Sequence, residues 1–309
     1  MCQNAPRPVT ILGIFVADTA FSAARLPKMG ETLGGSGFAV GPGGKGSNQA
    51  VAAARAGADV HFISRIGNDE FGRMALATYR EAGITAHIKH MEDVPTGAAF
   101  IFVNESSGEN AIIVYPGAAG TLGPEDAEAA RAIIETSAVF VTQLEQPSAA
   151  ARRSLEIARA AGVTTIFNPS PADQADDGLL ALSDFLVPNE GEAAALCGFD
   201  VDTLESARKA GDVLLERGVG HAVITLGGRG VLVHGPDISE LVPAQAAGTV
   251  VDTSGAGDAF LGSFAAAIAE GRSPLQSAQF ATAAAGIAVT RRGTAPAMPT
   301  RAEIDAALR

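Results

Sequence analysis

The sequence predicts an α/β fold, in which a doubly wound, mainly parallel sheet is covered by helices on both faces. Short apolar runs rich in β-branched residues alternate with longer stretches of helical periodicity, which is typical of repeated strand–helix–strand units. Aromatic residues make up only 5% of the 309 residues and Trp is absent, which favours close packing of helices on a sheet over a β-sandwich. We expect a single domain, 1–309.

Strands are expected where apolar runs lie between turn signals. The runs are Val9–Val16, Val60–Ile66, Ala138–Leu144, Val163–Asn168, Asp184–Val187 and Ala222–Leu226. Helical periodicity separates most of them, and several of the helical stretches end at glycine. These stretches are Ser47–Ala56, Glu70–Ala82, Pro124–Glu135, Ser148–Ala161, Glu190–Leu196 and Leu204–Arg217. From Ala256 onward the chain reads as alanine-rich helices, with a capped terminal helix at Arg301–Leu308.

Two stretches break this alternation and indicate antiparallel β structure. The first, at about 19–41, is rich in glycine and small residues. The second, at 96–115, contains two apolar runs with a polar turn between them. We expect them to form a small β lid inserted into the α/β body, because phosphoryl-transfer sites need a flap that excludes water. A surface hairpin without function would leave the same pattern.

Charge and cysteine usage limit the partners. The 34 acidic and 22 basic residues give a net charge of −12, which would repel nucleic acid and an anionic membrane surface. The only cysteines, Cys2 and Cys197, lack the spacing of a disulfide framework or a zinc site, and no run is long enough to span a bilayer. With no secretory signal pattern, we expect a cytoplasmic protein.

The segment Asp252-Thr253-Ser254-Gly255-Ala256-Gly257-Asp258 carries the clearest chemistry. It lies between a β-rich run, Gly248–Val251, and a helix, Ala259–Ala269. Small residues at a helix N-terminus let unpaired N–H groups approach an anion, which the helix dipole also favours. A carboxylate beside such an anion site is useful as a base, so we interpret Asp258 as the group that accepts a proton from an attacking hydroxyl. An acid that only stabilises the helix N-terminus would look the same.

A second glycine-rich segment, Gly41–Ala50, also runs into a helix. A Walker A loop would need Ser or Thr after Lys45 and a glycine in place of Ala39, so that interpretation fails. The pattern Gly41-x-Gly43-x-x-Gly46 matches a dinucleotide fingerprint, but that fingerprint is expected at the end of the first strand, near Gly13. Lys45 and Asn48 offer donors suited to sugar hydroxyls.

These two segments resemble the signatures of the ribokinase family of carbohydrate kinases. Further blocks resemble the family in the same order, so the likeness covers essentially the whole chain. They are Gln143-Leu144-Glu145, Asn168–Ala172, Pro188–Ala193 and Thr225–Gly230. The resemblance implies a kinase that transfers the γ-phosphoryl group of ATP to a primary hydroxyl of a small sugar, ribose first among the candidates. It also implies a homodimer formed through the lid.

The resemblance implies a role for each matching residue. Asp18, Gly44, Lys45, Asn48, Glu145 and Asp258 would bind the sugar, with Asp258 as base and Gly255, Ala256 and Gly257 as the amide array. Asn189, Thr225, Gly227, Gly228 and Gly257 would bind ATP, and Glu192 would organise Mg²⁺ through water. Asp252 and Ser254 would bind a monovalent cation, K⁺ in similar proteins. Asp18 and Glu145 could instead cap a turn or a helix.

Two positions depart from the family pattern. Val16 stands where Asn is usual, so one hydrogen-bonding group toward the sugar is replaced by an apolar side chain. A pentose of other stereochemistry, a deoxy sugar or a larger ketose could suit Val16 better than ribose. Ala297 stands where a hydroxyl usually binds the monovalent cation, which weakens the case for K⁺.

Two other functions are compatible with the sequence. One is a nucleoside, ketohexose or keto-deoxy-sugar-acid kinase on the same fold. The other is a sugar-binding regulator that has lost catalysis. Asp258 with its complete Gly-Ala-Gly segment argues against the regulator, because a binding protein has no need of a base there.

Overall fold

The computed structural model describes residues 8–309, so Cys2 lies outside the described residues. Within this range one sheet has nine strands in the order β13-β12-β11-β10-β9-β8-β1-β4-β5. Their bounds are Val9–Leu12 (β1), Val60–Gly67 (β4), Thr85–Met91 (β5), Val139–Thr142 (β8), Thr164–Phe167 (β9), Phe185–Leu186 (β10), His221–Thr225 (β11), Val231–Gly235 (β12) and Ile238–Val242 (β13). Neighbours from β5 to β11 pair in parallel, and only β12 and β13 join in antiparallel fashion. The predicted doubly wound α/β fold is confirmed.

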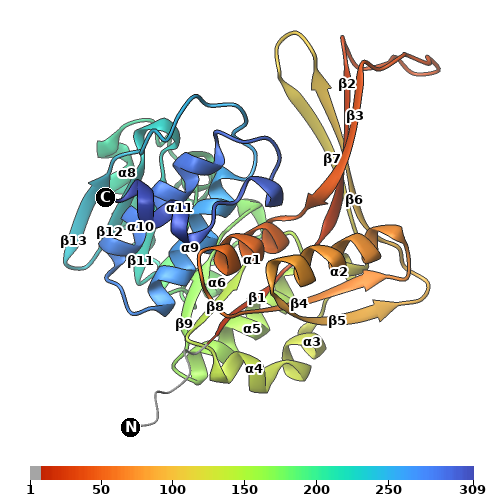
Figure 1. The fold of residues 1–309 in the computed structure, drawn as a ribbon. Coiled ribbons are helices and arrows are strands. Elements are labelled where there is room, and N and C mark those ends of the chain that lie inside the picture. Colours follow the sequence, from red (N-terminus) through yellow and green to blue (C-terminus); the bar gives the residue numbers. More distant parts are fainter. Residues whose placement is uncertain (1–7) are drawn as a thin grey trace.

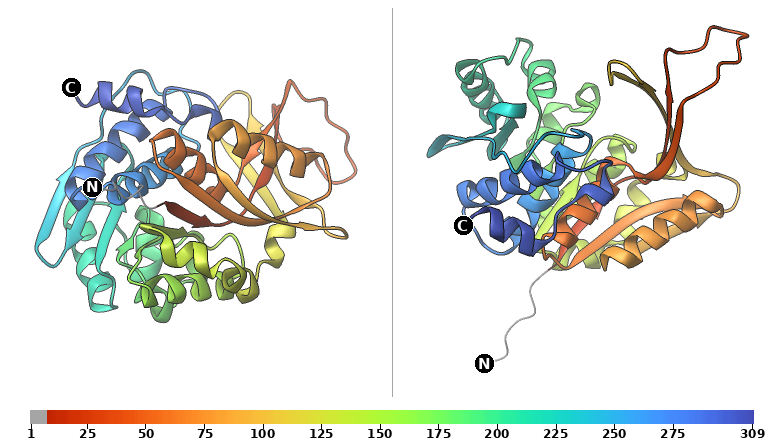
Figure 2. Two further views of the ribbon diagram at one scale, coloured as in Figure 1. Left: turned by 60° about the horizontal axis from the view of Figure 1, so that its bottom comes forward. Right: turned by 45° about the horizontal axis from the view of Figure 1, so that its top comes forward.

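Helices cover both faces of this sheet (Figure 2). One face carries Lys45–Arg55 (α1), Glu70–Ala82 (α2), Ala256–Ala269 (α9) and Pro274–Ala288 (α10), with Arg301–Ala307 (α11) packed on α10. The other face carries Pro124–Ala129 (α3), Arg131–Thr136 (α4), Ser148–Ala160 (α5), Asp177–Leu180 (α6), Glu190–Cys197 (α7) and Leu204–Glu216 (α8). Successive side chains of a strand point to opposite faces of the sheet, so Ile11 packs against the helices of the first face and Leu12 against those of the other face.

A second sheet of four strands projects from the body of the protein (Figure 1). Its order is β3-β2-β6-β7, with bounds Val16–Ala23 (β2), Gly37–Gly43 (β3), Thr96–Asn104 (β6) and Asn110–Gly117 (β7). The run Val9–Val16 was predicted as one strand, but it breaks at Gly13 because the chain passes there from the large sheet into the second one.

Two further expectations about elements are wrong. Gly248–Val251 forms no strand, and Val250 and Val251 are exposed beside the loop to α9. Pro124–Glu135 is interrupted at Ala130, where α3 ends and α4 begins.

The strand order defines where a ligand can bind. The chain extends from β1 toward β4 and β5 on one side and from β8 toward β11 on the other, so the direction of winding reverses between β1 and β8. The loops that follow these two strands diverge and leave a crevice at the carboxyl end of the sheet. Gly13 follows β1 and Gln143 follows β8, which places both at this crevice. Among the helices of residues 8–309, none combines the length and the apolar character that a membrane span requires.

Candidate active site

Asp258 lies in the first turn of α9 and is only 8% exposed. Helix α9 begins after Gly255, which adopts a left-handed conformation with φ of 72°. Within the described part of the chain, the N–H groups of Gly257 and Asp258 donate to no other residue. A Cβ added at Gly257 would meet no atom of residues 8–309 within 4 Å, so open space adjoins this residue, and both Gly257 and Asp258 line a cavity.

The carboxylate of Asp258 is held from α1. The Nδ2 atom of Asn48 donates to Oδ2 of Asp258 at 3.1 Å, and Nε2 of Gln49 donates to Oδ1 at 3.0 Å. Burial raises the pKa of Asp258, while Lys45, Gln49 and Asn48 oppose the rise. The amide oxygen of Asn48 is buried and has no partner within residues 8–309.

Helix α1 brings Lys45 into the same cavity. Gly44 precedes the helix with φ of 90°, and a Cβ there would lie 2.6 Å from the carbonyl oxygen of Ile14, so this close approach requires glycine. Burial tends to lower the pKa of Lys45, but the carboxylates of Asp258, Glu145 and Glu192 raise it above its usual value. Lys45 is therefore the cation that several acids share.

Two more acids, Asp18 and Glu145, lie close enough to Asp258 to interact with its charge, although neither lines the cavity. Burial raises the pKa of Asp18, on β2, to about 6, and the negative charge of Asp258 adds to the effect. The Asp18 carboxyl packs over Gly43, where a Cβ would lie only 2.3 Å from it. Burial also raises the pKa of Glu145, to about 7, although Lys45 opposes the rise. The structure thus brings Asp18, Gly44, Lys45, Asn48, Glu145 and Asp258 together.

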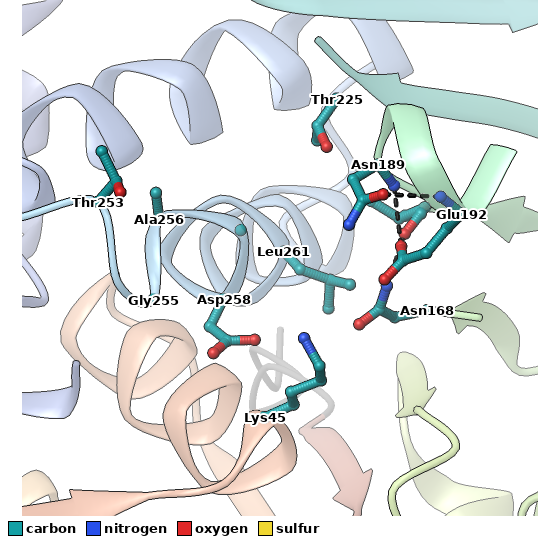
Figure 3. A pocket seen from close by; sticks show the side chains of 12 residues that line it. Lys45, Asn168, Asn189, Glu192, Thr225, Thr253, Gly255, Ala256, Asp258 and Leu261 are labelled. Carbon is teal, nitrogen blue, oxygen red and sulfur yellow. Dashed lines mark hydrogen bonds between the residues drawn. The ribbon is translucent and has the colours of Figure 1, made fainter. Parts of the chain in front are cut away.

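The opposite wall comes from the loops after β10 and β11 (Figure 3). The cavity has a volume of about 130 Å³ and is lined by Lys45, Asn168, Val187, Asn189, Glu192, Thr225, Thr253, Gly255, Ala256, Gly257, Asp258 and Leu261. It is smaller than the clefts that enclose a whole drug-sized ligand, which suits it to the reacting end of a nucleotide. Gly227 and Gly228 are exposed in the turn after β11 and do not line it.

Asn189 and Glu192 cap α7 reciprocally. The N–H of Asn189 donates to Oε2 of Glu192 at 2.9 Å, and the N–H of Glu192 donates to Oδ1 of Asn189 at 2.8 Å. Within residues 8–309 no donor contacts the second carboxylate oxygen of Glu192, which leaves it free for a hydrated cation. The capping box explains the Asn-x-x-Glu spacing locally, and the free oxygen allows a second role.

Asp252 and Ser254 lie outside this cavity, in the loop before α9. Asp252 accepts hydrogen bonds of 2.9 Å from the N–H of Ser254 and of 2.9 Å from the N–H of Gly293. Burial would raise the pKa of Asp252, but these bonds and Arg292 outweigh it and hold the pKa below its usual value. Ala297 follows Gly293 by four residues and is buried, and its side chain has no oxygen that could bind a cation.

Three amides near Asp258 were assigned no role from the sequence. Gln49 follows Asn48 on α1, Gln143 follows β8, and Asn168 follows β9 and donates to the carbonyl of Val187 at 2.8 Å. Gln143 and Asn168 stand in blocks that carry the family resemblance, and each follows the carboxyl end of a parallel strand. Ligands of parallel α/β sheets bind at the carboxyl ends of the strands, so the position of Gln143 and Asn168 in the sequence could have indicated a place in the site.

Comparison with known proteins identifies the class. The model of the pfkB family of carbohydrate kinases matches residues 8–301. Ribokinase from Haemophilus influenzae is 40% identical over 298 residues, which cover 96% of this chain and 97% of that protein. Deoxyribokinase from Salmonella typhi is 34% identical over 294 residues, covering 94% and 95%. The structure of Arabidopsis thaliana ribokinase complexed with ribose and ATP matches with a TM-score of 0.91 at 29% identity and covers 99% of both chains.

The chain therefore belongs to the pfkB family of carbohydrate kinases. It is an ATP-dependent sugar kinase, as the motifs predicted.

Proposed function

We propose that this kinase transfers the γ-phosphoryl group of ATP to the primary hydroxyl of D-ribose and forms ribose 5-phosphate and ADP. The observation that carries the proposal is the buried Asp258 carboxylate, which interacts with the charge of Lys45 and lies in the first turn of α9, where the N–H groups of Gly257 and Asp258 have no partner within residues 8–309. The ribokinases from Haemophilus influenzae and Arabidopsis thaliana support ribose as the acceptor.

In this proposal Asp258 accepts the hydroxyl proton while the acceptor oxygen bonds to the γ-phosphorus. The bond from that phosphorus to the bridging oxygen of ADP breaks in the same transfer. The N–H groups of Gly255 and Gly257 stabilise charge on the transferring oxygens. The N–H of Ala256, the third residue expected in this array, already donates to the carbonyl of Thr253 at 3.2 Å. Asp18, Gly44, Lys45, Asn48 and Glu145 orient the sugar, since carboxylate, ammonium and amide groups together accept from and donate to neighbouring hydroxyls.

ATP would occupy the wall formed by Asn189, Thr225, Gly227 and Gly228, with its reacting end in the cavity. Glu192 would hold Mg²⁺ through water, because one of its oxygens caps α7 and the other accepts no hydrogen bond from residues 8–309. When bound, Mg²⁺ would neutralise charge on the phosphate oxygens.

We also propose a monovalent-cation site beside the loop that begins α9. Asp252 suits this role because its carboxylate stays ionised and joins two loops whose carbonyls can serve as ligands, among them that of Ser254. Ala297 supplies no side-chain ligand, so we expect K⁺ to bind weakly.

The second sheet would act as a lid over the sugar and as a dimer interface. Phe21, Phe38, Phe100 and Ile113 share one face, since Phe21 lies opposite Phe38 and Phe100 opposite Ile113. Phe38 is 64% exposed and Ile113 is 70% exposed. Exposed apolar side chains gathered on one face favour pairing with a second copy. We expect the kinase to act in the cytoplasm, where ATP is available and Cys197 stays reduced.

A second acceptor, 2-deoxyribose, is favoured by Val16, which is 3% exposed and shares a face of β2 with Asp18. The deoxyribokinase from Salmonella typhi shows that this acceptor occurs among similar proteins. The test is ADP release with ribose, 2-deoxyribose, fructose, a keto-deoxy-sugar acid and adenosine, each with K⁺ or Na⁺. The proposal predicts the highest kcat/KM with ribose. A higher value with a hexose or a nucleoside would overturn it.

A further inference from the structure

A chain of two buried glutamines lies behind the Asp258 carboxylate. Nε2 of Gln143 donates a short hydrogen bond to Oε1 of Gln49, whose Nε2 donates to Oδ1 of Asp258 at 3.0 Å. Both glutamine side chains are fully buried between the sheet and the helices. The chain of hydrogen bonds therefore runs from the loop after β8, through α1, to the first turn of α9.

The direction of the Gln49 amide is determined by its two neighbours. A Gln amide can present either its N–H₂ group or its carbonyl oxygen, and only the N–H₂ group attracts a carboxylate. Because Gln143 donates to the oxygen of Gln49, the N–H₂ group of Gln49 must face Asp258. If Gln49 were turned over, its oxygen would lie against the carboxylate and its N–H₂ group against that of Gln143.

The backbone around Gln143 is shaped to admit its side chain. A Cβ at Gly13 would lie 2.5 Å from Oε1 of Gln143, and one at Gly46 would lie 2.9 Å from the same atom. Gly13 follows β1 and Gly46 lies in the first turn of α1. Burying two amides costs free energy, and the amide oxygen of Gln143 has no partner within residues 8–309, so apolar side chains would suit a purely structural contact better.

Asn48 and Gln49 hold different oxygens of the same carboxylate. Asn48 donates to Oδ2, and its own amide oxygen has no partner in the described range 8–309, so this amide can exchange its contacts when a sugar arrives. Gln49 is fully buried, and its amide oxygen already accepts from Gln143. Gln49 therefore keeps one oxygen of Asp258 in place.

We propose that Gln49 and Gln143 are positioning residues for phosphoryl transfer: Gln143 orients the Gln49 amide, and Gln49 holds Oδ1 of Asp258 so that the other oxygen meets the acceptor hydroxyl. This inference rests on the proposed role of Asp258 as base. A second consequence follows for titration. Burial raises the pKa of Asp258 and the amide of Gln49 counteracts the rise, so loss of that amide shifts the pKa further upward.

The test uses Gln49→Met, which preserves side-chain length and removes the donor. We expect kcat to fall about tenfold near pH 7, as for loss of a hydrogen bond to a charged group, with the sugar KM within about twofold. The defect should shrink as the pH rises, because the base regains its ionised form. The matched control is Gln146→Met: Gln146 is also buried and donates to Thr142 and to the carbonyl of Gln143, not to Gln49 or Asp258. Its pH profile should follow that of the wild type.

Gln143→Met gives a second, independent readout. It leaves Asp258 untouched but frees the Gln49 amide to turn, so the same alkaline shift should appear in a weaker form. The double variant should lose no more kcat than Gln49→Met alone, because both act through one contact. Should Gln49→Met fail to fold, the pH profile of Gln143→Met decides the question.

Two outcomes would overturn the inference. One is a kcat for Gln49→Met lowered by the same factor at every pH, and the other is additive losses in the double variant. Asp258→Asn distinguishes a failure of this inference from a failure of the proposal that Asp258 is the base. If Asp258→Asn keeps its turnover, the base proposal fails. If it is inactive and Gln49→Met shows no pH-dependent defect, only the glutamine inference fails.

Discussion

The main-chain N–H of Lys45 donates a hydrogen bond of 2.7 Å to Oε2 of Glu145. This contact ties the first residue of α1 to the loop after β8, across the point where the winding of the sheet reverses. A carboxylate at a helix N-terminus is stabilised by the helix dipole. Burial nevertheless dominates and raises the pKa of Glu145 to about 7.

The titration of Glu145 and Asp18 predicts how sugar use depends on pH. Their pKa values of about 7 and about 6 mean that both carboxylates become ionised only as the pH rises through this range. Ionised carboxylates accept hydrogen bonds from the sugar more strongly. We expect kcat/KM for ribose to fall about tenfold between about pH 8 and about pH 6. Glu145→Gln should remove the part of the profile near its pKa. An unchanged profile, merely scaled down, would contradict this assignment.

Asp18 should destabilise the ligand-free protein at neutral pH. Its pKa is about 6 in the folded state, against an ordinary value of 3.8, so the folded state binds more protons between these values and stability falls as the pH rises through them. Asp18→Asn should therefore raise Tm by about 2 °C or more near pH 8 and change it little near pH 4. Thermal scans at both values test this. A loss of Tm near pH 8 would show that the carboxylate stabilises the fold.

Val16 should influence the choice between ribose and 2-deoxyribose. Its partners across the second sheet are Gly43 and Gly97, so only glycines adjoin it on the neighbouring strands. An Asn at this position would offer hydrogen bonds to a hydroxyl, which are worth about 1–3 kcal/mol when the alternative is an unpaired buried group. Val16→Asn should raise the kcat/KM ratio of ribose to 2-deoxyribose about tenfold or more. Val16→Ala, which adds no polar group, is the control, and equal changes with both sugars would refute the role.

The apolar face of the second sheet should hold two copies together. Phe38 and Ile113 are among its most exposed side chains, and replacing both by Ser removes apolar area without touching the face that carries Asp18. We expect sedimentation equilibrium to show a dimer for the wild type and a monomer for the double variant. A monomeric wild type, or a variant that remains dimeric, would exclude this interface.

Local signals account for the elements that the sequence predicted well. Helix α2 begins after Asp69, whose side chain accepts from the N–H of Gly72, and it ends at Gly83 in the left-handed conformation. Both signals are visible in the letters. The strand expected at Gly248–Val251 failed because β propensity depends on a neighbouring strand, and no strand pairs with it within residues 8–309. β5 was not predicted because its pattern is largely polar. β12 and β13 were also not predicted, although β12 is apolar and as long as β11.

The sequence predicted the site residues that lie in motifs. It did not predict contacts between residues that the fold brings together from distant parts of the chain. The glycine-rich segments predict binding of an anion and of hydroxyl groups, and they contain Lys45, Asn48 and Asp258. The contact between Gln49 and Gln143 joins residues far apart in the chain, and it arises only because β1 and β8 are neighbours in the sheet. Pairwise contacts of this kind depend on topology, which spacing along the chain does not reveal.

The role of Asp258 is tested most directly by Asp258→Asn, with ADP release and sugar affinity measured on the same preparation. Asn keeps the size of the side chain but cannot take up the hydroxyl proton. Loss of the base should lower kcat by about 10²-fold to 10⁴-fold while the Kd for ribose changes little. A variant that releases ADP at nearly the wild-type rate would contradict the assignment of Asp258 as the base.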